Sequence, residues 1–300
     1  MNNNATDFDR IEKSARARKA VTKTLVFIFL GIWAFVVLFP FYWMILTSFK
    51  GYGEYNSEFI PKLFTLTPTF ENYIKAFTAV PLAKYFLNTL IFTVATTAIM
   101  LIVIIPAAFA FARLEFKGRD ALFAGLLATM MIPGELFTIT NYQTTYAFGW
   151  NDPYKWGFTI LIVPFLVSTF YIYLLRQNFL QIPNELYLAA KVDGVSDIKY
   201  LWKVMIPLSL PTLISITILK MMGAWNTYVW PNLVFRRYPD FLLVTNGIRG
   251  GDYSIDGAID MVNYPVQMAA VALVSLPLFM VFLFFRKYIM KGVSRSGIKG

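Results

Sequence analysis

The chain has 300 residues, of which 57% are hydrophobic and only 15% are charged, and its formal net charge is +10. A soluble globular domain carries about 25% charged residues, so this composition predicts a membrane protein. Cysteine and histidine are both absent, which excludes disulfides, thiol nucleophiles, zinc sites of the Cys/His type and an imidazole base. The composition therefore disfavours an enzyme, and we attribute the basic charge to membrane topology rather than to nucleic-acid binding.

Six apolar segments are long enough to cross a hydrocarbon core about 30 Å thick, which takes about 20 helical residues. They lie at residues 24–48, 86–111, 121–146, 156–175, 207–235 and 265–285. The first is too long for a signal-peptide core of about 7–15 residues, so we expect it to remain as the first span. The third is the weakest, because Pro133-Gly134 and Glu135 interrupt it. The predicted fold class is an all-α integral membrane protein with six transmembrane helices.

The distribution of lysine and arginine predicts the orientation of these spans. The two terminal tails and the loops at residues 112–120 and 176–206 hold 18 of the 27 basic residues, whereas the three opposite loops hold 8. By the positive-inside rule both termini are cytoplasmic, in a multi-pass protein of the cell membrane. The predicted domains are a cytoplasmic tail over residues 1–23, a six-helix transmembrane domain over 24–290 and a cytoplasmic tail over 291–300.

A polar segment at residues 182–206 separates the fourth and fifth predicted spans. Pro183 and Asn184 can begin a short helix there, because proline is tolerated near the first turn and asparagine is a good N-cap. Gly194 suits a left-handed position after its end, and Ser196 is a good N-cap for a second helix. A structured cytoplasmic hairpin between two spans is typical of a docking surface for a soluble partner. The alternative is an amphipathic connector that lies in the headgroup region.

The run Ala189-Ala190-x-x-Asp193-Gly194-x-Ser196 resembles the signature loop of permease subunits of binding-protein-dependent ABC importers. The flanking sequences are similar to the carbohydrate-importer branch, in particular to the maltose-type second permease subunit. They read PFYWMILTSFK, AFAFARLEFKGRD, GAWNTYVWPNLV and MKGVSRSGIKG. The resemblance implies that a coupling helix around residues 184–192 docks into an ATPase subunit.

The residues that the resemblance assigns to ATPase coupling are Glu185, Leu188, Ala189, Ala190, Asp193, Gly194 and Ser196. The family loop usually reads Glu-Ala-Ala, and Leu188 stands where that glutamate would be. Glu185 lies three residues earlier, on nearly the same face of the helix.

The resemblance also implies the partners: a homologous permease, two ATPase subunits, an extracytoplasmic solute-binding protein, membrane lipid and a carbohydrate, most simply an oligosaccharide. The chain has no GxxxxGK[ST] phosphate loop, so ATP and Mg are expected on the separate ATPase, and this chain is expected to bind no cofactor or metal. ATPase closure would rock the spans between inward-facing and outward-facing states. The tail at 294–300 resembles an element that reaches the ATPase pair, or else is a frayed terminus.

Lys220 lies near the middle of the fifth segment, where a lysine costs about 2.5–3.5 kcal/mol on insertion scales. It should therefore either pair with Glu135 or a partner subunit, or line a pathway for an anionic or heavily hydroxylated solute. Trp225, Asn226 and Tyr228 follow on the same segment, and aromatic rings with amides suit sugars. Aromatic residues near the end of a span also form interface belts.

The loop at residues 236–264 contains Gly250, Gly251 and Asp252. Its composition is typical of a flexible external loop. The resemblance instead implies a loop that reaches into the open binding protein and helps to displace the substrate. The loop at 49–85 is expected to contribute to the same docking surface.

Three alternatives remain open on the sequence. The same family could import glycerol phosphate or an acidic sugar, which Lys220 favours. A polytopic membrane enzyme would need clustered acid, base or metal groups at one face. A stand-alone secondary transporter would be expected to show an internal repeat and discontinuous helices at the midplane, and it would not need the cytoplasmic hairpin.

Overall fold

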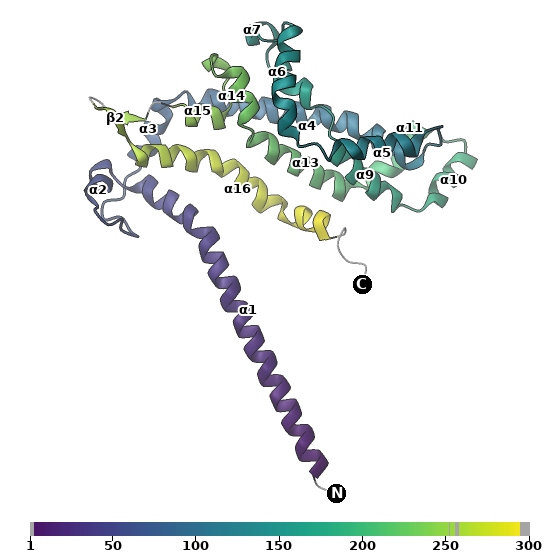
Figure 1. Cartoon of the computed structure of the whole chain (residues 1–300), viewed down its shortest axis with the longest axis horizontal. Coiled ribbons are helices and arrows are strands. Elements are labelled where there is room, and N and C mark those ends of the chain that lie inside the picture. The colour runs from purple at the N-terminus through teal and green to yellow at the C-terminus, as the bar shows by residue number, and fades with distance from the viewer. Residues whose placement is uncertain (1–2, 252, 256–257, 295–300) are drawn as a thin grey trace. The chain divides into compact units, whose positions relative to one another are not determined.

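The computed structural model describes residues 3–251, 253–255 and 258–294. The chain forms two compact units, Met1–Lys75 with Tyr253–Ala272 and Ala76–Asp252 with Leu273–Gly300. The described part is almost entirely helical (Figure 1). Its strands are the short antiparallel pair β1 (Ser254–Ile255) and β2 (Ala258–Val262).

Six segments of the described chain have the length and hydropathy of membrane spans. Three lie in single helices, α1 (Asn3–Phe49), α4 (Leu82–Arg113) and α16 (Tyr264–Ser294). The other three are bent pairs, Arg119–Thr129 with Gly134–Ala147, Thr159–Phe165 with Thr169–Leu180, and Asp197–Leu208 with Leu210–Trp225. This arrangement agrees with the six predicted spans.

A proline lies at or near each bend. Pro133 separates α5 (Arg119–Thr129) from η1 (Gly134–Leu136) and α6 (Phe137–Ala147), which meet at 79°. Pro164 lies in η2 (Val163–Phe165), between α8 (Thr159–Ile162) and α9 (Thr169–Leu180), where the bend is 51°. Pro207 and Pro211 flank the 80° bend between α12 (Ile206–Leu208) and α13 (Leu210–Trp225). A proline removes a backbone donor and its ring clashes with the preceding turn.

Helix α11 (Asp197–Tyr200) and the π-helix η3 (Leu201–Met205) run into α12 and form with it the first arm of the third bent pair. The remaining helices lie in the connecting segments. They are α2 (Tyr52–Ser57), α3 (Glu71–Ala79), α7 (Pro153–Trp156), α10 (Asn184–Val192), α14 (Val229–Phe235), η4 (Pro239–Phe241) and α15 (Val244–Arg249).

The prediction of a continuous fifth span over residues 207–235 is wrong at its C-terminal end. The span helix α13 ends at Trp225, and α14 follows as a separate short helix. The Asn226 side-chain amide donates to Met222 O at 3.0 Å and so helps to close the last turn. The apolar sequence continues into α14 because Trp230 and Phe235 are buried inside the protein. Burial in protein and burial in lipid select the same residue types, so composition alone did not separate the two helices.

In the first unit, buried polar contacts hold the segment that follows α1. Lys50 is only 1% exposed; its Nζ lies 2.6 Å from Glu58 Oε2 and donates to Lys62 O at 2.9 Å. Asn72 Nδ2 donates to Ser48 O at 2.9 Å and to Lys50 O at 2.7 Å. Because these groups satisfy one another away from water, the beginning of the loop at 49–85 has a defined conformation.

Helix α4 is the central element of the second unit and packs against α9 and α13 (Figure 1). Its buried side chains Met100, Ile104 and Phe109 share one core with residues of α9 and α13, such as Phe179 and Ile216. With 32 residues and about 1.5 Å of rise per residue, α4 is about 48 Å long. It therefore exceeds a hydrocarbon core of about 30 Å and can organise a different surface at each end.

The N-terminal end of α4 holds the first part of the long loop that follows the fifth span. Asn88 Nδ2 donates to Asp240 O at 2.9 Å and to Leu242 O at 3.0 Å. The backbone N–H of Val244 donates to Thr89 Oγ1 at 2.8 Å. This part of the loop is therefore fixed to the bundle, whereas its composition had suggested a flexible external loop.

Gly247 in α15 packs directly on the ring of Tyr85 in α4, so a Cβ at this position would overlap the ring. Tyr85 is only 5% exposed and has no free space into which to move. We expect Gly247→Ala to lower the free energy of unfolding by about 1–3 kcal/mol, as overpacking of a core does. Thermal unfolding of the purified protein in detergent would show this as a lower Tm.

Gly223 provides the matched control, because a Cβ there meets no atom within 4 Å. Gly223→Ala is expected to be neutral or to stabilise helix α13 by up to about 1 kcal/mol. Equal losses of Tm in the two variants would contradict the packing of α15 on α4.

Candidate functional site

The polar segment between the fourth and fifth spans forms a hairpin of α10 and α11, as predicted. Gly194 follows α10 with φ +70°, in the left-handed region that favours glycine. Its N–H donates to Lys191 O at 3.0 Å, and the N–H of Val195 donates to Ala190 O at 2.9 Å. These two bonds form a Schellman cap, which satisfies the last carbonyls of α10 and reverses the chain.

The residues at which the two helices of the hairpin begin are set by their N-caps. Ser196 begins α11 by accepting a hydrogen bond from Lys199 N at 3.4 Å, so the predicted second N-cap is confirmed. The N-cap of α10 is Pro183, and Asn184 is its first helical residue, so the expectation that Asn184 caps this helix is wrong.

A polar brace joins the two helices of the hairpin. Asp197 Oδ1 accepts from Tyr187 Oη at 2.7 Å and lies 2.6 Å from Lys191 Nζ. The hydrogen bond to Asp197 raises the pKa of Lys191. The ring of Tyr187 also lies 5.1 Å from that of the buried Tyr200. One carboxylate thus holds two side chains of α10, and the hairpin is a single rigid unit.

The faces of α10 have different roles. Tyr187 and Ala190 turn inward and pack against the core of the second unit. Leu188 and Val192 turn outward and are 55% and 89% exposed. Of the predicted coupling residues, Ala190 is therefore half-buried, and the others are exposed: Glu185, Leu188, Ala189, Asp193, Gly194 and Ser196.

Arg113, the last residue of α4, anchors the base of the hairpin. Its Nη2 donates to Phe179 O at 2.8 Å and also to Ile182 O, and the residue is only 8% exposed. The Phe179 carbonyl lies in the last turn of α9, where it also accepts from Ile182 N at 3.2 Å, and the Ile182 carbonyl lies just beyond the helix. The sequence does not reveal this role, because Arg113 has the pattern of a basic residue that flanks a span.

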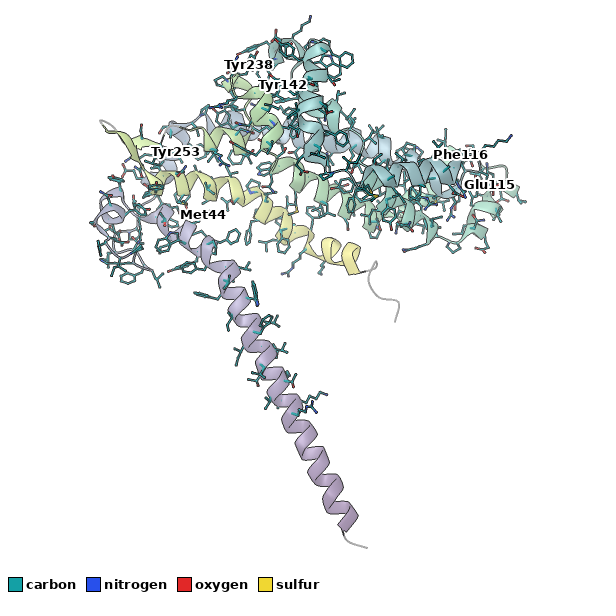
Figure 2. All side chains as sticks on the ribbon, viewed as in Figure 1. Met44, Glu115, Phe116, Tyr142, Tyr238 and Tyr253 are labelled. Carbon is teal, nitrogen blue, oxygen red and sulfur yellow. The ribbon has the colours of Figure 1, made fainter. Side chains whose placement is uncertain are left out.

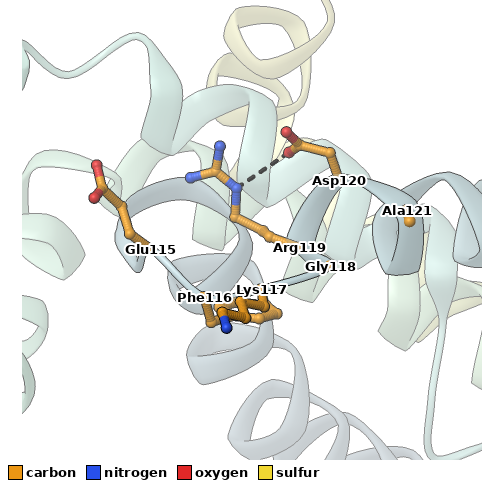
Figure 3. Close-up of a pocket in the computed structure, with 7 residues that line it drawn as sticks. All are labelled: Glu115, Phe116, Lys117, Gly118, Arg119, Asp120 and Ala121. Carbon is orange, nitrogen blue, oxygen red and sulfur yellow. Dashed lines mark hydrogen bonds and ion pairs between the residues drawn. The ribbon is translucent and has the colours of Figure 1, made fainter.

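A cavity of about 500 Å³ lies beside this anchor, lined entirely by the loop Glu115–Ala121 (Figure 3). Arg119 Nε contacts Asp120 Oδ1 at 3.1 Å, and Glu115 and Lys117 contribute one charge of each sign. The loop follows α4 directly, so it lies at the same end of the second unit as the hairpin (Figure 1). Its charges balance, which makes it a polar contact surface rather than a site for one anion or cation.

The predicted pathway residues of the membrane interior lie apart. Lys220 is half-buried on α13, and within the described residues no carboxylate lies within 4.0 Å of its Nζ. Glu135 is exposed in η1 and forms no ion pair in the same part of the chain. The predicted Lys220–Glu135 ion pair is therefore not formed.

The aromatic side chains near the end of the fifth span are largely in contact with other side chains of this protein. Trp225 is buried, with its ring 5.9 Å from that of Phe86. Asn226 is exposed, although its amide caps α13. The ring of Tyr228 lies 4.8 Å from the guanidinium of Arg249. Only Asn226 and part of Tyr228 thus present a free surface.

The predicted contact loop for a binding protein is described in part. Gly250 is exposed and ends α15, with Gly251 directly after it, whereas Asp252 lies outside the described residues. Over the residues that the structure describes, no three Asp or Glu side chains converge to hold a metal ion.

Bent spans around a long central helix, together with a rigid exposed hairpin between two of them, define a multi-pass membrane permease. Residues 104–295 match the binding-protein-dependent transport system inner membrane component family, and the chain belongs to this family. Membership implies an ATPase and a solute-binding protein as partners and makes the chain a transport subunit, so a stand-alone secondary transporter is excluded.

Relatives match along almost the whole chain. The arabinooligosaccharides transport system permease protein AraQ of Bacillus subtilis is 29% identical over 286 residues, covering 93% of this chain and 96% of the relative. The diacetylchitobiose uptake system permease protein NgcG of Streptomyces coelicolor is 28% identical, covering 88% and 85%.

A solved structure also matches the chain. The crystal structure of a bacterial ABC transporter involved in the import of the acidic polysaccharide alginate superposes with a TM-score of 0.77. The match covers 92% of this chain and 97% of that one at 23% identity, so it shows the fold. The predicted family and six-span fold are confirmed.

The polar brace predicts how the hairpin responds to mutation. Asp197→Ala removes the acceptor for both Tyr187 and Lys191, so α10 should open more often. We expect amide hydrogen exchange over residues 184–195 to rise by about tenfold, the change that corresponds to 1.4 kcal/mol. Mass spectrometry of the protein in lipid nanodiscs measures this rate.

Asp193→Ala is the matched control, since the exposed Asp193 carboxylate has no partner among the described side chains. It should leave hydrogen exchange unchanged. Equal protection in the wild-type protein and in Asp197→Ala would show that the brace does not hold the hairpin.

Proposed function

We propose that this chain is a permease subunit of an ATP-driven importer that moves a carbohydrate delivered by an extracytoplasmic binding protein. The observation that carries the proposal is the braced hairpin, which turns an exposed apolar face outward between two spans. The oligosaccharide and disaccharide named for AraQ and NgcG support the class of cargo, with an oligosaccharide as the simplest choice. The hairpin and both termini lie in the cytoplasm, as the distribution of basic residues indicates.

The other subunits supply the chemistry that this chain lacks. A homologous permease completes the pathway, and two ATPase subunits bind ATP and Mg. The absence of a GxxxxGK[ST] phosphate loop supports this division of labour.

Docking of the hairpin depends mainly on apolar burial. Leu188 and Val192 lie one turn apart on the outer face of α10 and are both largely exposed. Fully burying a side chain of this size contributes about 1.5–3 kcal/mol. Glu185 lies one turn before Leu188 and adds one negative charge at the edge of this face. We therefore assign to the ATPase a cleft with an apolar floor.

Force from the ATPase passes through rigid contacts. The Schellman cap at Gly194 and the Asp197 brace keep α10 from bending when it is pushed. Arg113 ties the base of the hairpin to α4, and the far end of α4 holds α15. The result is a rigid-body movement of the second unit, the kind of motion that alternating access requires.

Lys220 remains our first choice for the pathway. A half-buried lysine without an ion-pair partner in the described structure favours an anionic or heavily hydroxylated solute. Asn226 and Tyr228 are the other proposed contacts, because each retains exposed surface. Trp225 would act by positioning this segment, and Glu135 would face the water-filled side. Gly250, Gly251 and Asp252 remain the proposed contacts with the binding protein.

Leu188→Asp tests the docking face. A carboxylate placed against an apolar cleft should weaken capture of the ATPase by about tenfold or more and stop energised uptake. Affinity purification through a tag on this chain, followed by quantification of the ATPase, measures the effect.

Ile74→Asp is the control, because Ile74 is similarly exposed but lies on α3, in a loop of the opposite predicted side. It should leave the amount of copurified ATPase unchanged. If the ATPase copurifies equally with Leu188→Asp and uptake continues, the coupling role of this face is lost.

The cysteine-free chain also allows a direct test of orientation. Phe59 and Val192 are 99% and 89% exposed, so cysteines at these positions should react readily. We expect a membrane-impermeant maleimide to label Phe59→Cys in intact spheroplasts and Val192→Cys only in inverted vesicles. The reverse pattern would place the hairpin outside the cell and refute the proposed function.

A further inference from the structure

A second cavity, of about 630 Å³, lies in the second unit between α6 and α14. Figure 2 shows Tyr142 of α6 and Tyr238 near one another at this place. The polar side chains that line it are Tyr142, Thr145, Tyr146, Asn151, Asn232, Arg236, Arg237 and Tyr238. The volume falls within the range of about 300–1,000 Å³ that is usual for small-molecule sites.

The walls of this cavity are built by buried contacts. The Trp230 indole N–H of α14 donates to Ile160 O of α8 at 3.1 Å, and Phe235 is fully buried below. Tyr238 Oη donates to Asn151 O at 3.4 Å across the rim. The cavity is therefore preformed, as binding sites generally are.

The cavity lies at the end of the second unit that is opposite the hairpin. Its neighbour Asp240 bonds Lys84 at the beginning of α4, whereas Arg113 at the other end of α4 anchors the hairpin. By the proposed orientation, the cavity therefore opens toward the side from which cargo arrives.

The cavity carries positive charge without a counter-ion. Arg236 and Arg237 are both exposed, and no carboxylate of the described residues lies within 4.0 Å of either guanidinium. Asp240 and Asp152, which lie close to the lining residues Tyr238 and Asn151 in the sequence, are already engaged. Asp240 pairs with Lys84 and accepts from Tyr154 Oη at 2.9 Å, and Asp152 caps α7 by accepting from Tyr154 N at 2.9 Å. The hydrogen bond from Lys84 lowers the pKa of Asp240, which keeps this carboxylate ionised and paired.

The combination of groups selects one ligand chemistry. A guanidinium binds a carboxylate through two parallel hydrogen bonds. Tyrosine rings pack on the C–H faces of a sugar ring, and asparagine amides bond its hydroxyls. A neutral sugar would leave both arginines unpaired, and a small inorganic anion would leave the tyrosines and amides unused.

We infer that this cavity binds a carboxylated saccharide, with Arg236 and Arg237 on the uronate carboxylate and the tyrosines on the ring. The inference rests on the proposed function and narrows the cargo to an acidic sugar. Lys220 is a further cation of the same unit that forms no ion pair within the described residues, which agrees with an acidic cargo.

The test is equilibrium binding of trigalacturonate to the full chain in phosphatidylcholine nanodiscs, with maltotriose as the neutral probe. We expect saturable binding of trigalacturonate that weakens with added salt, and binding of maltotriose that is weaker by about tenfold or more. The double variant R236Q/R237Q should lose about tenfold in affinity for trigalacturonate and keep the same weak affinity for maltotriose.

Lys155→Gln is the matched control, because Lys155 lies over the ring of Trp156 and does not line the cavity. It should change the affinity by less than about twofold. Equal loss with Lys155→Gln, or equal affinity for the two trisaccharides, would overturn the inference.

Two further arms separate the saccharide from other anions. Nanodiscs that contain phosphatidylglycerol, and competition by inorganic phosphate, ask whether a headgroup or free anion takes the site. Unchanged trigalacturonate affinity in both arms supports a saccharide site, and full displacement in either arm overturns it. Failure of trigalacturonate to bind would remove the acidic cargo and leave the permease role, which ATPase capture by the Leu188 face and the labelling of Phe59→Cys and Val192→Cys test separately.

Discussion

The contact between the Arg113 guanidinium and the carbonyls of Phe179 and Ile182 determines how the rest of the structure can work. These carbonyls lie at and just beyond the C-terminal end of α9, at the negative end of its dipole, so one buried cation complements their charge. The same residue ends α4. Together with the packing of Tyr187 and Ala190 on the core, this contact joins the hairpin to the bundle, so a push on the hairpin moves the bundle with it.

Helix α4 connects the Arg113 contact to the opposite end of the second unit. At its other end, Asn88 and Thr89 bond the backbone of the loop that follows α14. The two polar ends are separated by an apolar middle that shares a core with α9 and α13. Both surfaces of the second unit are therefore attached to one continuous helix, through which a displacement at one end can reach the other.

The sequence was informative where a local signal had one structural meaning. The glycine after α10, the N-cap Ser196 and the break at Pro133 were all predicted, because caps and prolines act within a few residues. It misled where one residue type serves two environments. The apolar run of α13 and α14 predicts a single span, although the structure has two helices. Arg113 has the pattern of a basic residue that flanks a span, which indicates topology and not a structural contact. The lack of a Lys220–Glu135 pair depends on tertiary placement, which no local pattern records.

The leucine at position 188 has a consequence beyond this one chain. An acidic residue at that point could be read by many basic clefts, since a salt bridge tolerates variation in its surroundings. An apolar side chain such as leucine needs a cavity of matching shape. An ATPase with a different cleft would leave either a void or a buried charge at the contact. In a cell with several related importers, such an apolar contact would prevent the ATPases of the other importers from coupling to this permease.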